Sequence, residues 1–249
     1  WQLAEACRGI SDACLAFATP VTGGNVSLYN ETQSGTVRAI HPTPTIGMVG
    51  MVRDIRQVCS QDFKAAGDLV YLLGALDPGL GASEYLKVVH GLVAGEPPWL
   101  NLALEIQVQQ TCRAGIERGL FRSAHDLSEG GLAVALAECC ISGNLGITAR
   151  ITGPASRLDT LFFGETASVI VVSIAARDQL VCESFLTSVL GNNWQKLGSV
   201  GDSASGFSLG AEGHSPLLHV TLEALRRTWQ QAIPRRMEPT LFVEVSHDS

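Results

Sequence analysis

Short apolar runs alternate with segments of helical periodicity over most of the chain, from about residue 55 onwards. The apolar run 69–73 has the length and composition of a buried strand. Further strands are expected at 146–151, 168–174 and 194–200, and helices at 84–90, 102–119, 128–142, 177–190 and 221–231. Strands that alternate with helices are typical of a sheet with helices packed on it. The sequence therefore predicts an α/β (α+β) domain in this part of the chain.

The N-terminal part has a different pattern. Residues 2–18 place apolar side chains at helical spacing, and Pro20 ends the expected helix. Cys7 and Cys14 lie one heptad apart on that helix, so we expect both to face a core. The apolar run 46–52 is expected to form a strand. Because the stretch after it is polar and lacks clear periodicity, we place a domain boundary near residue 55.

Composition limits the classes of function. Apolar residues make up 46% and charged residues 16% of the chain, which predicts a sizeable buried core. The formal charge is −7 and no polybasic run is present, so binding to nucleic acid is not expected. No apolar stretch reaches the roughly 18 residues that cross a bilayer, so we expect a soluble protein without membrane contact. The seven cysteines include no Cys-x-x-Cys pair, which predicts free thiols in a reducing cytoplasm.

The segment Val21-Thr-Gly-Gly-Asn-Val-Ser-Leu-Tyr-Asn-Glu-Thr32 combines two glycines with several oxygen-bearing side chains. A glycine lets the backbone approach a ligand closely because it has no Cβ. Amide and hydroxyl oxygens, such as those of Asn25 and Ser27, suit Mg²⁺, which also keeps waters and phosphate oxygens as ligands. Gly-Gly and Asn-rich clusters are also ordinary turn chemistry, so composition alone leaves a β-turn or bulge as the alternative.

Several motifs in the same order resemble one enzyme family, phosphoribosylformylglycinamidine synthase, of the aminoimidazole ribonucleotide synthetase superfamily. The resemblance covers residues 1 to about 234. Beside the segment 21–32, it rests on Trp1-Gln-Leu through Gly9-Ile-Ser-Asp-Ala-Cys14, Pro42-Thr-Pro-Thr-Ile-Gly-Met-Val-Gly50, Ala124-His-Asp-Leu-Ser-Glu-Gly-Gly-Leu132 and Leu222-Glu-Ala-Leu-Arg-Arg-Thr-Trp229.

The resemblance implies an architecture. The family is built from two copies of one unit, and this chain is similar to roughly the last third of the longer polypeptide. Residues 1–54 then complete an N-terminal-type domain built around a β-barrel, and residues 55–234 form the α/β C-terminal-type domain. The tail 235–249 is either a docking strand or a frayed end, and it is too short for a glutaminase domain. We therefore expect the small, multi-subunit form of the enzyme, with a separate glutaminase subunit and a small accessory subunit.

The resemblance also implies a reaction. The complete enzyme is an ATP-dependent carbon–nitrogen ligase of purine biosynthesis in the cytoplasm, and it uses ATP and Mg²⁺. It converts formylglycinamide ribonucleotide and glutamine-derived ammonia to formylglycinamidine ribonucleotide. Position by position, Gly24 would contact ATP, Asn25 would bind Mg²⁺, and Ser27 would contact the substrate. The family's proton-accepting histidine lies in the missing N-terminal part of the same polypeptide, so the isolated chain is expected to be inactive.

A second set of candidate residues lies at 124–131. Here the resemblance places Asp126 where some relatives hold a structural nucleotide or metal. The alternative is that Asp126 and Ser128 cap the following helix while His125 packs beneath it. Farther along, Glu165 is expected to belong to a hydrogen-bond network at the end of a strand. It lies in a Gly-Glu-Thr-Ala sequence, and Ala167 replaces the amide of the family's substrate-binding triplet.

Two other functions remain open. One is a different ATP-dependent synthetase of the superfamily, such as aminoimidazole ribonucleotide synthetase or selenophosphate synthetase. The segment 21–32 as written argues against both. The other is a non-catalytic scaffold, in which this part of the polypeptide stabilises the complete enzyme and docks its partners.

Overall fold

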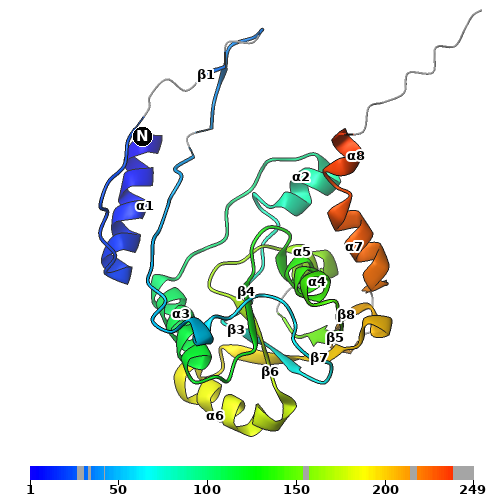
Figure 1. Ribbon diagram of the computed structural model, residues 1–249. Coiled ribbons are helices and arrows are strands. Elements are labelled where there is room, and N and C mark those ends of the chain that lie inside the picture. The colour runs from blue at the N-terminus through cyan, green and yellow to red at the C-terminus, as the bar shows by residue number, and fades with distance from the viewer. Residues whose placement is uncertain (27–30, 33–34, 42, 154–156, 214–217, 238–249) are drawn as a thin grey trace, which may run out of the picture.

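A sheet of seven strands forms the centre of the computed structural model (Figure 1). The structure describes residues 1–26, 31–32, 35–41, 43–153, 157–213 and 218–237. The strand order is β4-β6-β3-β7-β5-β8-β9. The strands are β3 (Leu69–Leu73), β4 (Ser123–Asp126), β5 (Gly146–Ile151), β6 (Ile170–Ile174), β7 (Trp194–Gly201), β8 (Phe207–Ala211) and β9 (Leu218–Val220).

Helices cover both faces of this sheet. One face carries α3 (Leu102–Glu117) and α6 (Gln179–Leu190), and the other carries α4 (Gly131–Gly143), α5 (Leu158–Phe163) and α7 (Leu222–Gln230). Successive side chains of β3 point to opposite faces of the sheet. Tyr71 therefore packs in the core under α3 and α6, and Leu72 packs in the core under α4. Two short helices, α2 (Glu84–His90) and α8 (Pro234–Met237), complete this part.

The expected α/β (α+β) fold is confirmed, and most strand pairs are antiparallel. Strand β3 pairs antiparallel with β6 and β7, and β5 with β8 is the parallel pair among the described strands. The expected strands near 69–73, 146–151, 168–174 and 194–200 are present, as are the expected helices. Strands β4, β8 and β9 and helices α5 and α8 were not predicted, and α8 (Pro234–Met237) includes the first residues of the expected tail 235–249.

The N-terminal helix forms as expected but is not packed into a core. Helix α1 (Gln2–Phe17) ends at Ala18 in the left-handed region, and none of its residues is buried. Cys7 is exposed and Cys14 half-buried, so the expectation that both face a core is wrong within this chain. Helix α1 lies beside the sheet-containing part and approaches it at α3 (Figure 1).

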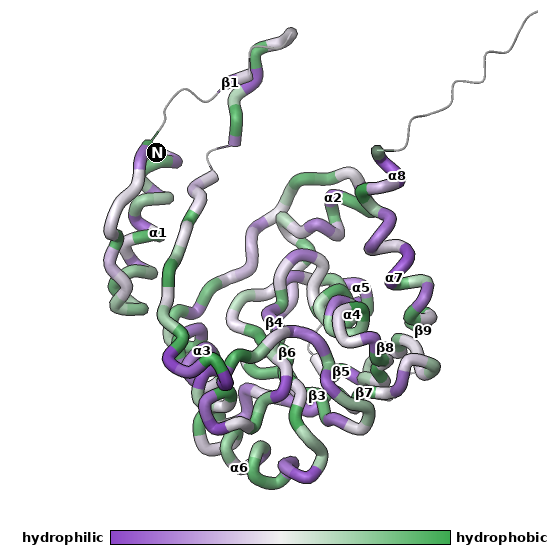
Figure 2. The backbone as a smooth tube through the Cα atoms, viewed as in Figure 1, coloured by the Kyte–Doolittle hydropathy of each residue, from purple (hydrophilic) through white to green (hydrophobic). Residues whose placement is uncertain are grey.

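The expected strand at 46–52 is also wrong. These residues have no regular structure and are exposed, and the side chain of Val49 is 99% exposed. A strand needs a partner for its backbone hydrogen bonds, and none of the described strands lies beside this run. Within the described part of the chain, strands β1 (Glu31–Thr32) and β2 (Arg38–Ala39) pair with each other and not with the seven-stranded sheet. Figure 2 shows several hydrophobic stretches along this outlying part of the chain.

Over the described ranges, none of the helices combines the length and the apolar character that a membrane crossing requires.

Candidate functional site

Gly24 and Asn25 lie in an exposed segment without regular structure that follows α1. A Cβ added at Gly24 would meet no atom within 4 Å. The packing of the described residues therefore gives no reason for a glycine at this position, and among them the backbone is open to approach by another group. Ser27 lies outside the described residues. The structure does not bring this segment together with the other candidate residues.

Asp126 is the last residue of β4, which is an edge strand of the sheet. Its side chain is 72% exposed, whereas that of the neighbouring His125 is 14% exposed. The two residues alternate across the strand because successive side chains point to opposite faces. His125 thus belongs to the interior under α4, and Asp126 offers a carboxylate to solvent.

His125 is hydrogen-bonded to one carboxylate and lies near a second. Its Nε2 lies 2.8 Å from Oε2 of Glu138, and its Nδ1 lies 3.4 Å from Oδ1 of Asp126. Glu138 belongs to α4, so the imidazole links that helix to the end of β4. The expectation that His125 packs beneath the helix is confirmed. Such a link fixes the ring next to the exposed carboxylate.

The capping alternative for Asp126 and Ser128 is wrong. Helix α4 starts at Gly131 with Gly130 at its N-cap, and no side chain makes a capping hydrogen bond. Gly131 has a φ of 67°, and a Cβ there would lie 2.4 Å from the carbonyl oxygen of Gly164. The second glycine of the motif is therefore required for close packing.

Glu165 forms the hydrogen-bond network that was expected of it. Its Oε1 accepts hydrogen bonds from the backbone N–H groups of Glu84 at 2.9 Å and Gly130 at 3.1 Å. Its own backbone pairs with Gly79 in both directions. The Glu165 carboxylate thus connects the start of α2 to the turn before α4. Its Oε1 is occupied by these two backbone donors.

The described residues hold no group of three or more His, Cys, Asp or Glu side chains that could bind a metal ion. Asn25 carries a side-chain amide oxygen and Asp126 an exposed carboxylate, and the two lie at separate places in the chain. Either oxygen would suit Mg²⁺ only as a single protein ligand, because Mg²⁺ completes its shell with waters and phosphates.

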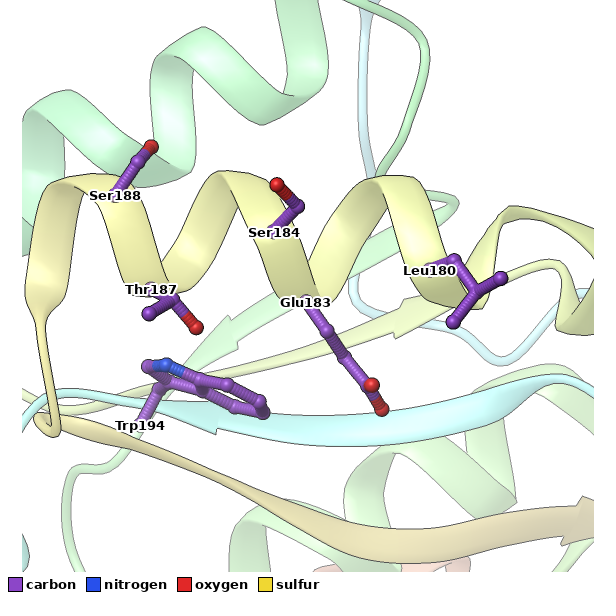
Figure 3. Close-up of a pocket in the computed structure, with 6 residues that line it drawn as sticks. All are labelled: Leu180, Glu183, Ser184, Thr187, Ser188 and Trp194. Atoms are coloured by element: carbon purple, nitrogen blue, oxygen red, sulfur yellow. The ribbon is translucent and has the colours of Figure 1, made fainter.

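A shallow groove of about 500 Å³ runs between α6 and the start of β7 (Figure 3). Glu183 and Thr187 point toward the side of Trp194, whereas Ser184 and Ser188 point away. The Glu183 carboxylate accepts hydrogen bonds from the Tyr71 hydroxyl and from Gln179, both at 2.9 Å. The Tyr71–Glu183 pair could not be predicted from the sequence, because Tyr71 lies within an apolar run. The Glu183 carboxylate provides the hydrogen-bond acceptor that the buried Tyr71 hydroxyl needs.

Comparison with known proteins connects these features to one family. Residues 65–209 match the family model described as AIR synthase related protein, C-terminal domain. The chain is 60% identical over 239 residues to the phosphoribosylformylglycinamidine synthase subunit PurL of Gloeobacter violaceus, covering 96% of this chain and 31% of that protein. It is 48% identical over 242 residues to the same subunit of Nostoc sp., covering 95% of this chain and 31% of that protein. The chain thus spans about a third of the length of these relatives.

Solved structures share the fold. The Thermotoga maritima PurL complexed with FGAR superimposes with a TM-score of 0.59 at 14% identity, over 69% of this chain and 30% of that one. The same protein complexed with ATP gives a TM-score of 0.55 at 15% identity, over 69% and 28%. At this level of identity the similarity establishes the architecture alone.

Proposed function

This chain belongs to the AIR synthase related protein family, and from that premise we propose that it forms the C-terminal third of the synthetase subunit of phosphoribosylformylglycinamidine synthase. The observation that carries the proposal is the 60% identity over 96% of the chain to a relative with this name. The complete polypeptide is then an ATP-dependent ligase that acts on formylglycinamide ribonucleotide and ammonia derived from glutamine.

In this reaction ATP phosphorylates the amide oxygen of the substrate, and ammonia then displaces phosphate to give the amidine. Bound Mg²⁺ would neutralise charge on the phosphates of ATP. This chain contributes a backbone without side-chain bulk at Gly24, which lets a phosphate approach. It contributes the amide oxygen of Asn25 as a metal ligand and the hydroxyl of Ser27 as a substrate contact.

The exposure of Gly24 and Asn25 supports this assignment. Both are open to solvent, and no atom of the described residues lies within 4 Å of a Cβ added at Gly24. Residues that complete a site shared with the rest of the polypeptide would be exposed when that rest is missing. The exposed apolar side chains of α1 and of 46–52 fit the same account.

Asp126 has a separate proposed role. We assign it to a structural nucleotide or metal rather than to the reacting centre. Its carboxylate is solvent-exposed at the edge of the sheet, and His125 and Glu138 hold the strand end that carries it.

The domain organisation and partners follow from the same proposal. Residues 1–54 complete a second nucleotide-binding domain of the β-barrel-forming type, residues 55–234 form the C-terminal-type domain, and 235–249 are a tail. The complete subunit assembles in the cytoplasm with a glutaminase subunit and a small accessory subunit.

The proposal is tested by ammonia-dependent turnover. The complete polypeptide and residues 1–249 alone are each supplied with ATP, Mg²⁺, formylglycinamide ribonucleotide and ammonium. We expect the complete polypeptide to release phosphate and form the amidine, and the isolated chain to do neither. A complete polypeptide that forms no amidine, or an isolated chain that turns over ATP robustly, would overturn the proposal.

A further inference from the structure

An apolar groove of about 460 Å³ lies between α4, α7 and β9, on the face of the sheet that carries α4. None of the residues to which we assign ATP, Mg²⁺ or substrate lines it. Each of the three elements contributes apolar side chains, among them Ile141 of α4, Val220 of β9 and Leu225 of α7. Glu138 and Thr228 are the polar residues of the lining. A groove of this composition suits an apolar segment of polypeptide.

The apolar surface continues from the groove along the C-terminal helices. Trp229 lines the groove, and Ile233 and Met237 follow it at intervals of four residues. The N–H of Met237 bonds to the carbonyl of Ile233, so these two residues lie one helical turn apart. The exposed fractions of the three residues are 57%, 74% and 77%. Large apolar side chains exposed so close together indicate that another group covers them.

Strand β9 adds a sheet edge to the groove. It is the last strand in the order of the seven-stranded sheet, and it pairs with β8 on one side. None of the described strands pairs with its other side. An edge strand presents backbone N–H and C=O groups on which a further strand can form. Because Leu218 and Val220 both line the groove, a strand beside β9 would direct every second side chain toward it.

The residues that follow α8 have the composition of such a strand. They read Glu-Pro-Thr-Leu-Phe-Val-Glu-Val-Ser-His-Asp-Ser over 238–249 and lie outside the described residues. Leu241, Val243 and Val245 are apolar and two residues apart. Aromatic, β-branched and alternating apolar residues favour a strand with one apolar face. Next to β9, that face would be directed into the groove.

The charges of the two segments are complementary. Helices α7 and α8 carry one acidic residue, Glu223, and four basic residues, namely Arg226, Arg227, Arg235 and Arg236. In a chain with a formal charge of −7, this is a local excess of positive charge. Residues 238–249 contain glutamate and aspartate but no lysine or arginine. Charge attraction therefore favours this segment on the surface of α7 and α8, and salt would weaken the attraction.

Residues 238–249 are long enough to reach the groove. Ala232 lines the groove, and α8 ends at Met237, directly before this segment. Helix α7 has 9 residues and is therefore about 14 Å long. A dozen extended residues span roughly 40 Å, which allows a turn after α8 and a return along α7. A tethered segment also has an effective concentration on the order of millimolar, which favours it over a separate molecule.

We propose that residues 238–249 fold back onto their own chain and occupy this groove. Residues 241–245 form an additional strand beside β9, and their alternate apolar side chains fill the groove. The acidic residues of the segment lie near the arginines of α7 and α8. The proposal does not depend on the assignment of ATP, Mg²⁺ or substrate above.

Removing the segment and returning it as a separate peptide tests the proposal. The 249-residue chain and a variant that ends at Met237 are each titrated with a fluorescent peptide of residues 238–249, and anisotropy measures binding. We expect the shortened chain to bind the peptide, and the 249-residue chain to bind it at least about tenfold more weakly, because its own segment competes. The matched control peptide carries Leu241→Asp and Val243→Asp and should not bind. Absence of peptide binding to the shortened chain up to about 1 mM, or equal binding to both chains, would overturn the proposal.

Hydrogen exchange of the 249-residue chain gives a test that does not require the shortened variant to fold. Val243→Asp should speed amide exchange in β9 at least about tenfold and leave exchange in β3 unchanged. The exposed Val181 of α6 provides the matched control, and Val181→Asp should leave exchange in β9 unchanged. Unchanged β9 exchange in Val243→Asp would overturn the proposal. Protection of β9 that increases with chain concentration would also overturn it, because the groove would then be covered by a second copy.

Discussion

Oε1 of Glu165 lies 3.1 Å from the backbone nitrogen of Gly130, so a carboxylate before β6 holds the turn that begins α4. The same oxygen accepts from the backbone of Glu84 at the start of α2. One side chain thus fastens two helices at the end of the sheet.

Glu165→Ala should lower the free energy of unfolding by about 2 kcal/mol, because two backbone donors lose a charged acceptor. Glu165→Gln keeps an oxygen acceptor, so it should lower the free energy of unfolding by about half as much. Urea unfolding measures both. The exposed Glu96 provides the matched control, and Glu96→Ala should change the value by less than about 0.5 kcal/mol. Equal effects of Glu165→Ala and Glu96→Ala would contradict the role of Glu165.

Arg122→Met should destabilise the chain by about 2 kcal/mol. Nη1 of Arg122 lies 2.7 Å from Oδ1 of Asp68, whose side chain is 4% exposed. Burial raises the pKa of Asp68, and Arg122 partly offsets this by favouring the charged carboxylate. Removing the cation leaves a buried charge, at a cost below that of a fully buried pair because Arg122 is partly exposed.

Chemical unfolding at pH 7 measures this effect, with the exposed Arg113→Met as the control. Adding Asp68→Asn to Arg122→Met should recover part of the loss, because the buried charge is then absent. A double variant less stable than Arg122→Met would show that the charge is not the cause.

The free energy of unfolding should fall as the pH rises from about 9 to 11. Burial is the main cause that raises the pKa of the Cys182 and Cys112 thiols from 9.0 to about 11. A pKa that is higher in the folded state favours the protonated folded chain. Its contribution is complete below pH 9, the unfolded value, and is lost as pH rises through 11. Each thiol contributes about 3 kcal/mol to this fall.

Urea unfolding between pH 7 and about 11 measures how the free energy of unfolding changes with pH. Cys182→Ala should flatten it, apart from a constant loss of packing at all pH values. Parallel curves for the two proteins would exclude Cys182 as a source of the pH dependence.

Thiol reactivity should distinguish the isolated chain from the complete polypeptide. In the isolated chain at neutral pH, the exposed Cys7 should react rapidly with a thiol reagent, and the buried Cys139 and Cys140 should react only on unfolding. In the complete polypeptide, Cys7 should be protected at least about tenfold if the rest of the subunit covers α1. Mass spectrometry of the labelled peptides measures each site, and equal labelling of Cys7 in both proteins would contradict this covering.

The sequence predicted those elements whose pattern is local. The run 69–73 is β3 because its continuous apolar residues are buried on both faces of the sheet. Asn101 and Thr221 start α3 and α7 through side-chain capping bonds, which gives these helices clear beginnings.

Elements that depend on distant partners could not be predicted. Strand β4 has the polar sequence Ser-Ala-His-Asp and is a strand because β6 supplies its hydrogen bonds. Conversely, 46–52 is apolar and lacks a partner among the described strands, so its pattern gave the wrong result. At the candidate site, the motif around Asp126 was found from its residues, but its link to Glu138 depends on tertiary packing.

We propose above that Asn25 contributes a metal ligand to ATP-dependent amidine synthesis. Its most direct test is the Mg²⁺ dependence of ammonia-dependent amidine formation by the complete polypeptide carrying Asn25→Ala, compared with the exposed control Asn192→Ala. We predict that Asn25→Ala lowers kcat/KM at least about a hundredfold and raises the Mg²⁺ concentration needed for half-maximal rate, whereas Asn192→Ala changes neither. Near-normal turnover with an unchanged Mg²⁺ dependence in Asn25→Ala would contradict the account.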